Sequence, residues 1–135
     1  MADDSGITAH ALVTEPGVHS ARYSGKKSDD AANNAKLVER LSKFEDKSAH
    51  YTCVLVAVRS HDDPDPIVCE GCWYGEIIAS PKGDGGFGYD PHFYLPEQGC
   101  TAAELSAEEK NRLSHRGKAM RLLLTEMQER WGVGR

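Results

Sequence analysis

The sequence predicts an α/β fold in a single domain. Two amphipathic helical patterns, one before residue 44 and one near the C-terminus, flank a pair of apolar runs with strand character. A chain of 135 residues is long enough for one domain that buries roughly two-thirds of its unfolded surface. We therefore expect one α/β domain over residues 1–135, in which helices pack on a sheet.

The chain begins with two adjacent carboxylates. Asp3 and Asp4 precede Ser5 and Gly6, and residues 6–13 are apolar enough for a short strand. Carboxylates at a tight turn can hold a hard cation such as Mg²⁺, and an aspartate close by can take a proton from water. The first residues therefore indicate a metal-dependent hydrolytic chemistry.

A first helix is predicted over residues 29–43. The Ser-Asp-Asp sequence at 28–30 is typical of a helix start, because a side-chain oxygen caps free N–H groups and acidic residues favour the helix dipole. Leu37, Leu41 and Phe44 follow at helical spacing. These three side chains are expected to share the buried face of the helix.

Two strands are predicted after this helix. Residues 50–59 and 67–74 are apolar runs, and the polar Asp/Pro segment 61–66 separates them. Such an arrangement is typical of a hairpin. Residues 75–78 are expected to continue the pairing.

The segment 81–91 contains four glycines and two prolines, which exclude a helix or a central strand. It fits neither the G-x-G-x-x-G nor the Walker A pattern. Two interpretations remain open. The segment is either a long turn, or a nucleobase pocket in which Phe87 and Tyr89 lie on a backbone of small residues. Stacking of a base on an aromatic ring is worth about 1–3 kcal/mol.

Two further helix starts are predicted near the C-terminus. Residues 106–109 form a capping-box pattern, and Lys110 follows on that helix. If Ser114 is the next N-cap, His115 and Arg116 lie in a first turn whose free N–H groups suit anionic or carbonyl oxygens. The alternative is that these basic residues form a solvated face. The apolar stripe beyond them is interpreted as core packing: Met120, Leu123, Leu124, Met127 and Trp131.

Charge and hydropathy exclude several classes of partner. The formal net charge is −5, and no basic run stands out, so a nucleic-acid polymer is not expected as a partner. No stretch approaches the roughly 20 apolar residues of a membrane span, and no signal peptide is recognisable. We expect no membrane partner and a cytoplasmic protein.

The cysteines have two possible interpretations. Cys69 and Cys72 have C-x-x-C spacing, but a zinc site needs two further ligands at a recognisable interval. Cys53 lies in an apolar run that reads as a buried strand. We favour buried, neutral thiols over metal ligands or disulfides.

Five motifs in order carry a resemblance to a known family. They occupy residues 2–6, 16–23, 85–91, 109–111 and 114–117. Together they resemble the inosine triphosphate pyrophosphatase family, which acts on non-standard purine nucleoside triphosphates. The resemblance extends over essentially the whole chain. It favours the nucleobase pocket over the plain turn, and substrate contacts over a solvated face.

The resemblance implies an enzyme that cleanses the nucleotide pool. It would hydrolyse ITP, dITP or XTP between the α- and β-phosphates, giving the monophosphate and pyrophosphate with Mg²⁺ as cofactor. Asp4 matches the family's catalytic base and is also expected to bind the metal. Asp3 is either a second metal ligand or a residue that stabilises the turn.

The resemblance also implies a set of substrate-binding residues, with Phe87 as the ring that stacks on the base. Lys110 would offset triphosphate charge. Arg116 has only donors, so it can pair with the 6-keto oxygen of hypoxanthine but not with the amino group of adenine. The full set is Ser5, Phe87, Gly88, Tyr89, Asp90, Lys110, His115 and Arg116.

The family fold implied is an elongated mixed β-sheet flanked by helices, assembled as a homodimer. Family members begin with a strand, a Ser/Thr-Gly-Asn-x-x-Lys phosphate-binding loop and a helix, and this sequence lacks that motif. We expect this leading part to be absent, and Asp4 to lie near a terminus that frays. The expectation is an N-terminally truncated domain that is weak or inactive alone. The alternative to an active hydrolase is a nucleotide-binding homologue without turnover.

Overall fold

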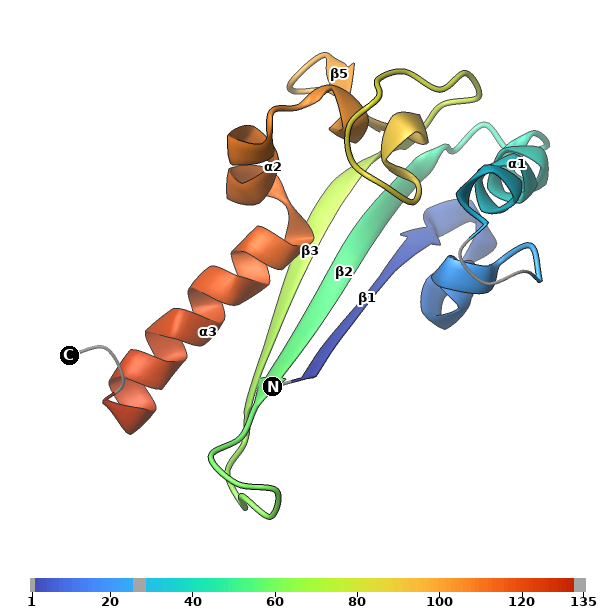
Figure 1. Ribbon diagram of the computed structural model, residues 1–135. Coiled ribbons are helices and arrows are strands. Elements are labelled where there is room, and N and C mark those ends of the chain that lie inside the picture. The colour runs from blue at the N-terminus through green and yellow to red at the C-terminus, as the bar shows by residue number, and fades with distance from the viewer. Residues whose placement is uncertain (1, 26–28, 133–135) are drawn as a thin grey trace.

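The computed structural model describes residues 2–25 and 29–132. Five strands form one sheet in the order β1-β2-β3-β4-β5, and the helices α1, α2 and α3 pack beside it (Figure 1). The strands are β1 (Ala2–Ala9), β2 (Ser48–Ala57), β3 (Ile67–Ile77), β4 (Phe93–Leu95) and β5 (Cys100–Thr101). The helices are α1 (Asp30–Leu41), α2 (Ala107–Leu113) and α3 (His115–Trp131).

The predicted α/β class is confirmed, but the sheet is antiparallel at each described pairing where a mixed sheet was expected. The predicted hairpin is present as β2 and β3, and β3 extends to Ile77 as expected. The tip between them, residues 58–66, is too short for the crossover that parallel pairing requires. The reversal of direction therefore follows from the length of the connection.

The N-terminal carboxylates lie in a strand and not at a turn, which corrects the predicted start of this element at residue 6. In β1, Asp3 pairs with Leu55 and Asp4 with Val54 of β2. The apolar β2 offers a backbone partner along its whole length, so the polar residues are drawn into the sheet with the apolar ones. The strand ends at Ala9, where a short 3-10 turn begins.

Both long helices were predicted, with small differences in what they bury. In α1, Leu37 and Leu41 are buried, whereas Phe44 lies beyond the end of the helix and is exposed. Asp29 is the N-cap and accepts from the Ala32 amide, and the predicted contribution of Ser28 falls outside the described residues. In α3, Leu123 is buried but Leu124, one residue further round the helix, is exposed.

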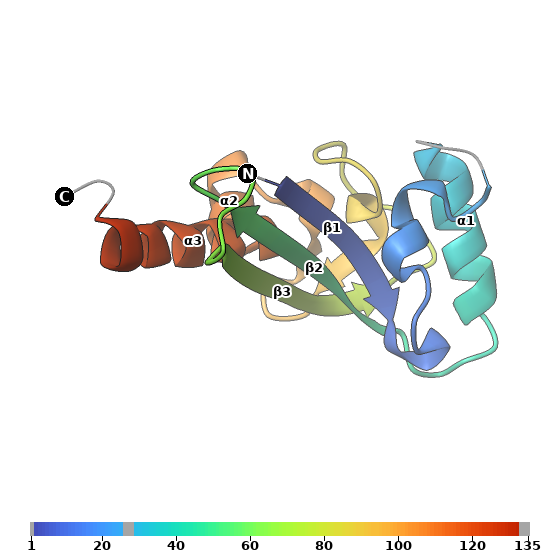
Figure 2. The same cartoon turned by 90° about the horizontal axis from the view of Figure 1, so that it is seen from below.

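A glycine allows α3 to approach the sheet closely. A Cβ atom at Gly71 of β3 would lie 2.2 Å from the His115 carbonyl oxygen and 2.7 Å from the Ala119 amide nitrogen. The helix crosses β2 and β3 with its N-terminal end toward the glycine-rich segment (Figures 1 and 2). This contact fixes where His115 and Arg116 stand relative to the sheet.

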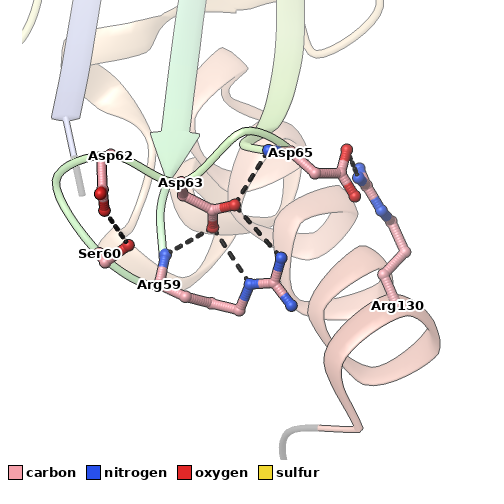
Figure 3. A network of polar contacts seen from close by, with 6 residues as sticks. All are labelled: Arg59, Ser60, Asp62, Asp63, Asp65 and Arg130. Atoms are coloured by element: carbon pink, nitrogen blue, oxygen red, sulfur yellow. Dashed lines mark hydrogen bonds and ion pairs between the residues drawn. The ribbon is translucent and has the colours of Figure 1, made fainter.

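One ion pair lies within the hairpin tip and a second joins the tip to the end of α3 (Figure 3). The Arg59 guanidinium donates to both oxygens of Asp63 at 3.1 and 3.2 Å, and the Arg59 amide donates to Asp63 at 2.9 Å. Asp65 pairs with Arg130 of α3. The predicted polar turn is therefore fixed in place by hydrogen bonds and ion pairs.

All four cysteines are free thiols, and Cys53 and Cys69 are buried. Cys69 and Cys72 are three residues apart in β3, so strand alternation directs them to opposite faces. Their C-x-x-C spacing cannot bring the two sulfur atoms together. Within 2–25 and 29–132, no helix has both the length and the apolar character needed to cross a membrane.

Candidate active site

A cavity of about 470 Å³ lies where β1, the glycine-rich segment and the junction of α2 and α3 meet. All eight residues predicted to bind substrate line it: Ser5, Phe87, Gly88, Tyr89, Asp90, Lys110, His115 and Arg116. Sequence reasoning missed other lining residues, including Ser20, Asp30, Tyr51 and Asn111. Asn111 follows directly after Lys110 in a motif already noted, whereas nothing in its local sequence marks Tyr51.

The glycine-rich segment is held against α1 by polar contacts. The Gly88 amide donates to Asp30 Oδ2 at 2.9 Å, and Asn34 Nδ2 donates to the Gly88 carbonyl at 2.9 Å. Gly88 has a φ of 62°, which favours glycine at this position. The neighbouring Phe87 side chain is 75% exposed. The segment therefore presents an aromatic ring on a fixed backbone.

Asp90 is the most heavily bonded carboxylate of the cavity, and it is buried. Its Oδ1 accepts from the Tyr51 hydroxyl at 3.0 Å. Its Oδ2 accepts from Lys110 Nζ at 2.5 Å and from the Phe87 amide at 3.1 Å. The Lys110 ammonium also lies 4.6 Å from the centre of the Phe87 ring. Asp90 therefore fixes the Lys110 ammonium and the glycine-rich segment relative to each other.

Tyr89 is placed differently from Phe87. Its ring is buried, and its hydroxyl donates to the Ser20 carbonyl at 2.7 Å. Burial raises the pKa of this hydroxyl above its ordinary value. Tyr89 thus remains a neutral donor that ties the glycine-rich segment to the segment after β1.

The turn between α2 and α3 brings two basic side chains to the cavity. Ser114 caps α3 by accepting from the Gly117 amide at 3.0 Å, as predicted. A Cβ atom at Gly117 would lie 1.8 Å from the Asn111 carbonyl oxygen, so glycine is required for the sharp turn. His115 and Arg116 therefore occupy the first turn of a 17-residue helix, where free N–H groups favour an oxygen atom of a ligand.

His115 is a neutral imidazole at pH 7. Its ring stacks on Tyr51, with centroids 4.6 Å apart and planes 8° apart. Burial lowers its pKa to about 4, and the nearby Arg116 and Lys110 act in the same direction. Among the described residues, its buried Nδ1 has no hydrogen-bond partner.

The two N-terminal aspartates face different ways. Asp3 pairs with the Arg116 guanidinium at 2.6 Å, so it lies on the face that α3 covers. Since side chains alternate along a strand, Asp4 is directed to the opposite face, and it is not among the residues that line the cavity. Sequence adjacency therefore did not bring both carboxylates to one site.

No group of three or more His, Cys, Asp or Glu side chains suited to a metal occurs in the part of the chain that the structure describes. Asp4 is exposed and can offer one carboxylate, and Asp3 already has a cationic partner. Mg²⁺ commonly takes only one or two protein carboxylates, with substrate phosphates and water completing its shell. Metal binding by Asp4 therefore stays a prediction, and a single exposed carboxylate is compatible with it.

The cavity is suited to a flat ring that carries negative charge. Phe87 offers an exposed aromatic face, and Lys110 and Arg116 offer cationic donors. His115 is an uncharged polar group, and the first turn of α3 adds backbone N–H groups. The fold and the cavity thus define an α/β protein whose cavity places an exposed aromatic ring beside cationic side chains.

Comparison with known proteins identifies the family. The sequence profile of the Ham1 family matches residues 1–126, and the chain belongs to that family. A dITP/XTP pyrophosphatase of Ralstonia nicotianae is 59% identical over 130 residues, which cover 94% of this chain and 65% of that protein. A dITP/XTP pyrophosphatase of Nitrosomonas europaea is 58% identical over 129 residues, covering 96% and 64%.

Solved structures agree with this assignment. A HAM1 protein from Coxiella burnetii superposes with a TM-score of 0.90 at 48% identity, covering 95% of this chain and 66% of that one. The Ham1 protein of Staphylococcus aureus gives a TM-score of 0.88 at 42% identity, covering 94% and 65%. The family resemblance and the fold class are confirmed. The chain spans just under two-thirds of the length of the curated relatives named above.

Proposed function

We propose that this protein hydrolyses the non-standard purine nucleoside triphosphates ITP, dITP and XTP to the monophosphate and pyrophosphate. The observation that carries the proposal is that all eight candidate substrate-binding residues line one cavity. The relatives named dITP/XTP pyrophosphatase support hydrolysis over binding without turnover.

The base would lie against Phe87, and its keto group would accept from a donor near the start of α3. Arg116 carries only donors, and its pairing with Asp3 at 2.6 Å restrains the guanidinium. A 6-keto oxygen would accept from those donors, whereas a 6-amino group would offer them no acceptor. The arrangement therefore favours 6-keto purines over adenine.

The triphosphate would extend past Lys110 toward β1. In the hydrolysis, the oxygen of water forms a bond to the α-phosphorus, the bond from that phosphorus to the bridging oxygen breaks, and pyrophosphate leaves. The family resemblance makes Asp4 the candidate that would take the proton from water and hold a metal, although its carboxylate is directed to the face of β1 opposite the cavity. Bound Mg²⁺ would neutralise charge on the phosphate oxygens. The residues of this chain would orient the base and balance the remaining negative charge.

The test compares nucleotides and one variant. Purified protein is incubated with Mg²⁺ and with ITP, dITP, XTP, ATP or GTP, and pyrophosphate release is measured. Inosine monophosphate binding is followed separately by intrinsic fluorescence. Lys110→Met keeps the length of the side chain but removes the charge, and it is expected to weaken nucleotide binding about tenfold or more.

Lys118→Met is the matched control. Lys118 is also a lysine beside this site in sequence, but its Nζ donates to the Cys72 carbonyl and it does not line the cavity. This variant is expected to bind nucleotide as the wild type does. Equal hydrolysis of ATP and ITP, or equal loss in the two lysine variants, would contradict the proposal.

We also propose a cytoplasmic homodimer, as the family resemblance implies. Val68 of β3 and Val58, just after β2, are 60% and 42% exposed, so this end of the sheet has apolar surface available for a partner. Analytical ultracentrifugation across a range of protein concentrations tests the dimer. A single monomeric species at all concentrations would argue against it.

A further inference from the structure

Tyr51 lines the cavity without belonging to any of the predicted motifs. It lies in β2 and is buried. Its ring stacks on His115, contacts the edge of Phe93 at a centroid distance of 4.6 Å, and lies 6.1 Å from Trp73. Packing on three sides leaves the ring one available orientation.

The hydroxyl of Tyr51 acts on a different part of the cavity from its ring. It donates to Asp90 Oδ1 at 3.0 Å, which leaves Oδ2 for Lys110 and the Phe87 amide. Burial and the Asp90 charge raise the pKa of this hydroxyl well above its ordinary value. The hydroxyl therefore stays protonated and remains a donor across the working pH range.

We propose that Tyr51 is the positioning residue that sets both ends of the cavity, its ring fixing the plane of His115 and its hydroxyl fixing Asp90 and, through Asp90, Lys110. The proposal rests on the proposed function for the identity of the ligand, but its geometry is a property of the free protein. One rigid side chain thus links the first turn of α3 to the glycine-rich segment and α2.

Two variants separate the ring from the hydroxyl. Tyr51→Phe keeps the stack on His115 and removes only the bond to Asp90. Tyr51→Leu removes both. Tyr74→Phe is the matched control. It also removes one tyrosine hydroxyl, but Tyr74 lies in the neighbouring strand, is exposed and does not line this cavity. Thermal unfolding of each variant verifies that it folds.

The hydroxyl is tested by comparing inosine monophosphate with inosine. Because the hydroxyl acts through Asp90 on both Lys110 and the Phe87 amide, Tyr51→Phe is expected to weaken the monophosphate about tenfold. Inosine has no phosphate for Lys110 to contact, so its binding is expected to weaken less. In a Lys110→Met background, Tyr51→Phe is expected to cost less monophosphate affinity than it does in the wild type. Equal weakening of both ligands, or an additive loss, would overturn this part of the proposal.

The ring is tested in the protein without ligand. The groups that face the His115 imidazole are Asp90 and Asp3, which raise its pKa, and Arg116 and Lys110, which lower it. Tyr51→Leu exposes the imidazole to water, so its pKa by NMR titration is expected to rise toward the ordinary value for histidine. Tyr51→Phe is expected to leave it near the wild-type value.

A second measurement without ligand follows the loop. The Phe87 amide donates to Asp90 Oδ2, so its hydrogen exchange is expected to be faster in Tyr51→Phe than in Tyr74→Phe. Unchanged exchange, or an unchanged His115 titration in Tyr51→Leu, would overturn the proposal. If these two readouts change while the wild type binds no purine, the proposed function fails and the positioning role of Tyr51 stands.

Discussion

A single carboxylate organises the candidate site at the scale of residues. Asp90 collects donors from three separate parts of the chain: Tyr51 in β2, the Phe87 amide in the glycine-rich segment and Lys110 in α2. A buried carboxylate is stable only when such donors satisfy it. The loop, the lysine and the tyrosine are therefore held together through Asp90, and a change near its oxygens is expected to disturb all of them.

Gly86 offers a test of this role. Its φ is 73°, and a Cβ atom there would lie 2.2 Å from Asp90 Oδ2. Gly86→Ala is expected to lower stability by about 1–3 kcal/mol from backbone strain, and to displace the carboxylate as well. Nucleotide affinity is expected to fall with it, as measured by fluorescence titration beside urea unfolding.

Gly99→Ala is the control for the strain alone. Gly99 has a similar φ of 69°, but a Cβ atom there would have no heavy atom within 4 Å. It is expected to lose stability without losing nucleotide affinity. If both variants keep full affinity, Asp90 does not hold the loop in the way described.

At the scale of elements, local sequence signals were sufficient to predict where helices α2 and α3 begin. Ser106 and Ser114 cap α2 and α3 as predicted, because an N-cap depends only on residues within one turn. The faces of Asp3 and Asp4 could not be predicted in the same way. Their direction depends on how β1 pairs with β2, some 50 residues later in the chain, and such pairing leaves no local pattern.

The candidate site likewise contains residues that local sequence motifs reveal and residues that only long-range packing reveals. The motifs containing Phe87, Lys110 and His115 were recognised because their residues are adjacent in sequence. Tyr51 was not recognised, because it lies within an apolar strand and meets Asp90 across 39 residues. Its role follows from the packing of α3 on β2 and β3, which the sequence pattern of one strand does not contain.

The hairpin tip gives a prediction for an element (Figure 3). Hydrogen bonds from Arg59 and from the Asp65 amide lower the pKa of the Asp63 carboxyl below its ordinary value. A group whose pKa is lowered on folding stabilises the protein above the unfolded pKa of about 4, and this contribution is lost as the pH falls toward the folded value. Asp63→Asn is therefore expected to lower the urea midpoint at pH 7, and the difference from the wild type to shrink at pH 3.

Asp62→Asn is the control at the same tip. Among the described residues, Asp62 accepts only from the Ser60 hydroxyl, at 2.9 Å, and has no cationic partner. Its effect is expected to be small at both pH values. The same loss at pH 7 and pH 3 for Asp63→Asn would show that the ion pair is not what holds the tip.

At the scale of the whole molecule, the cavity exists only when distant parts of the chain are assembled. Ser5 comes from β1, Gly88 from the glycine-rich segment and Arg116 from α3. A ligand that binds this cavity therefore binds the folded state and has no comparable site on the unfolded chain. Binding must then raise the stability of the whole fold by mass action.

Thermal unfolding in the presence of ligands tests this link between binding and stability. Inosine monophosphate at 100 times its Kd is expected to add about 2.7 kcal/mol, which for a domain of this size raises Tm by roughly 10 °C. An ITP analogue with a non-hydrolysable α,β-bridge is expected to raise Tm more with Mg²⁺ than with EDTA, because the metal offsets phosphate charge. The monophosphate shift is expected to depend little on EDTA, since Lys110 and Arg116 need no metal to act. Adenosine monophosphate is the matched control, and an equal shift with it would show that the donors at the start of α3 do not select a 6-keto purine.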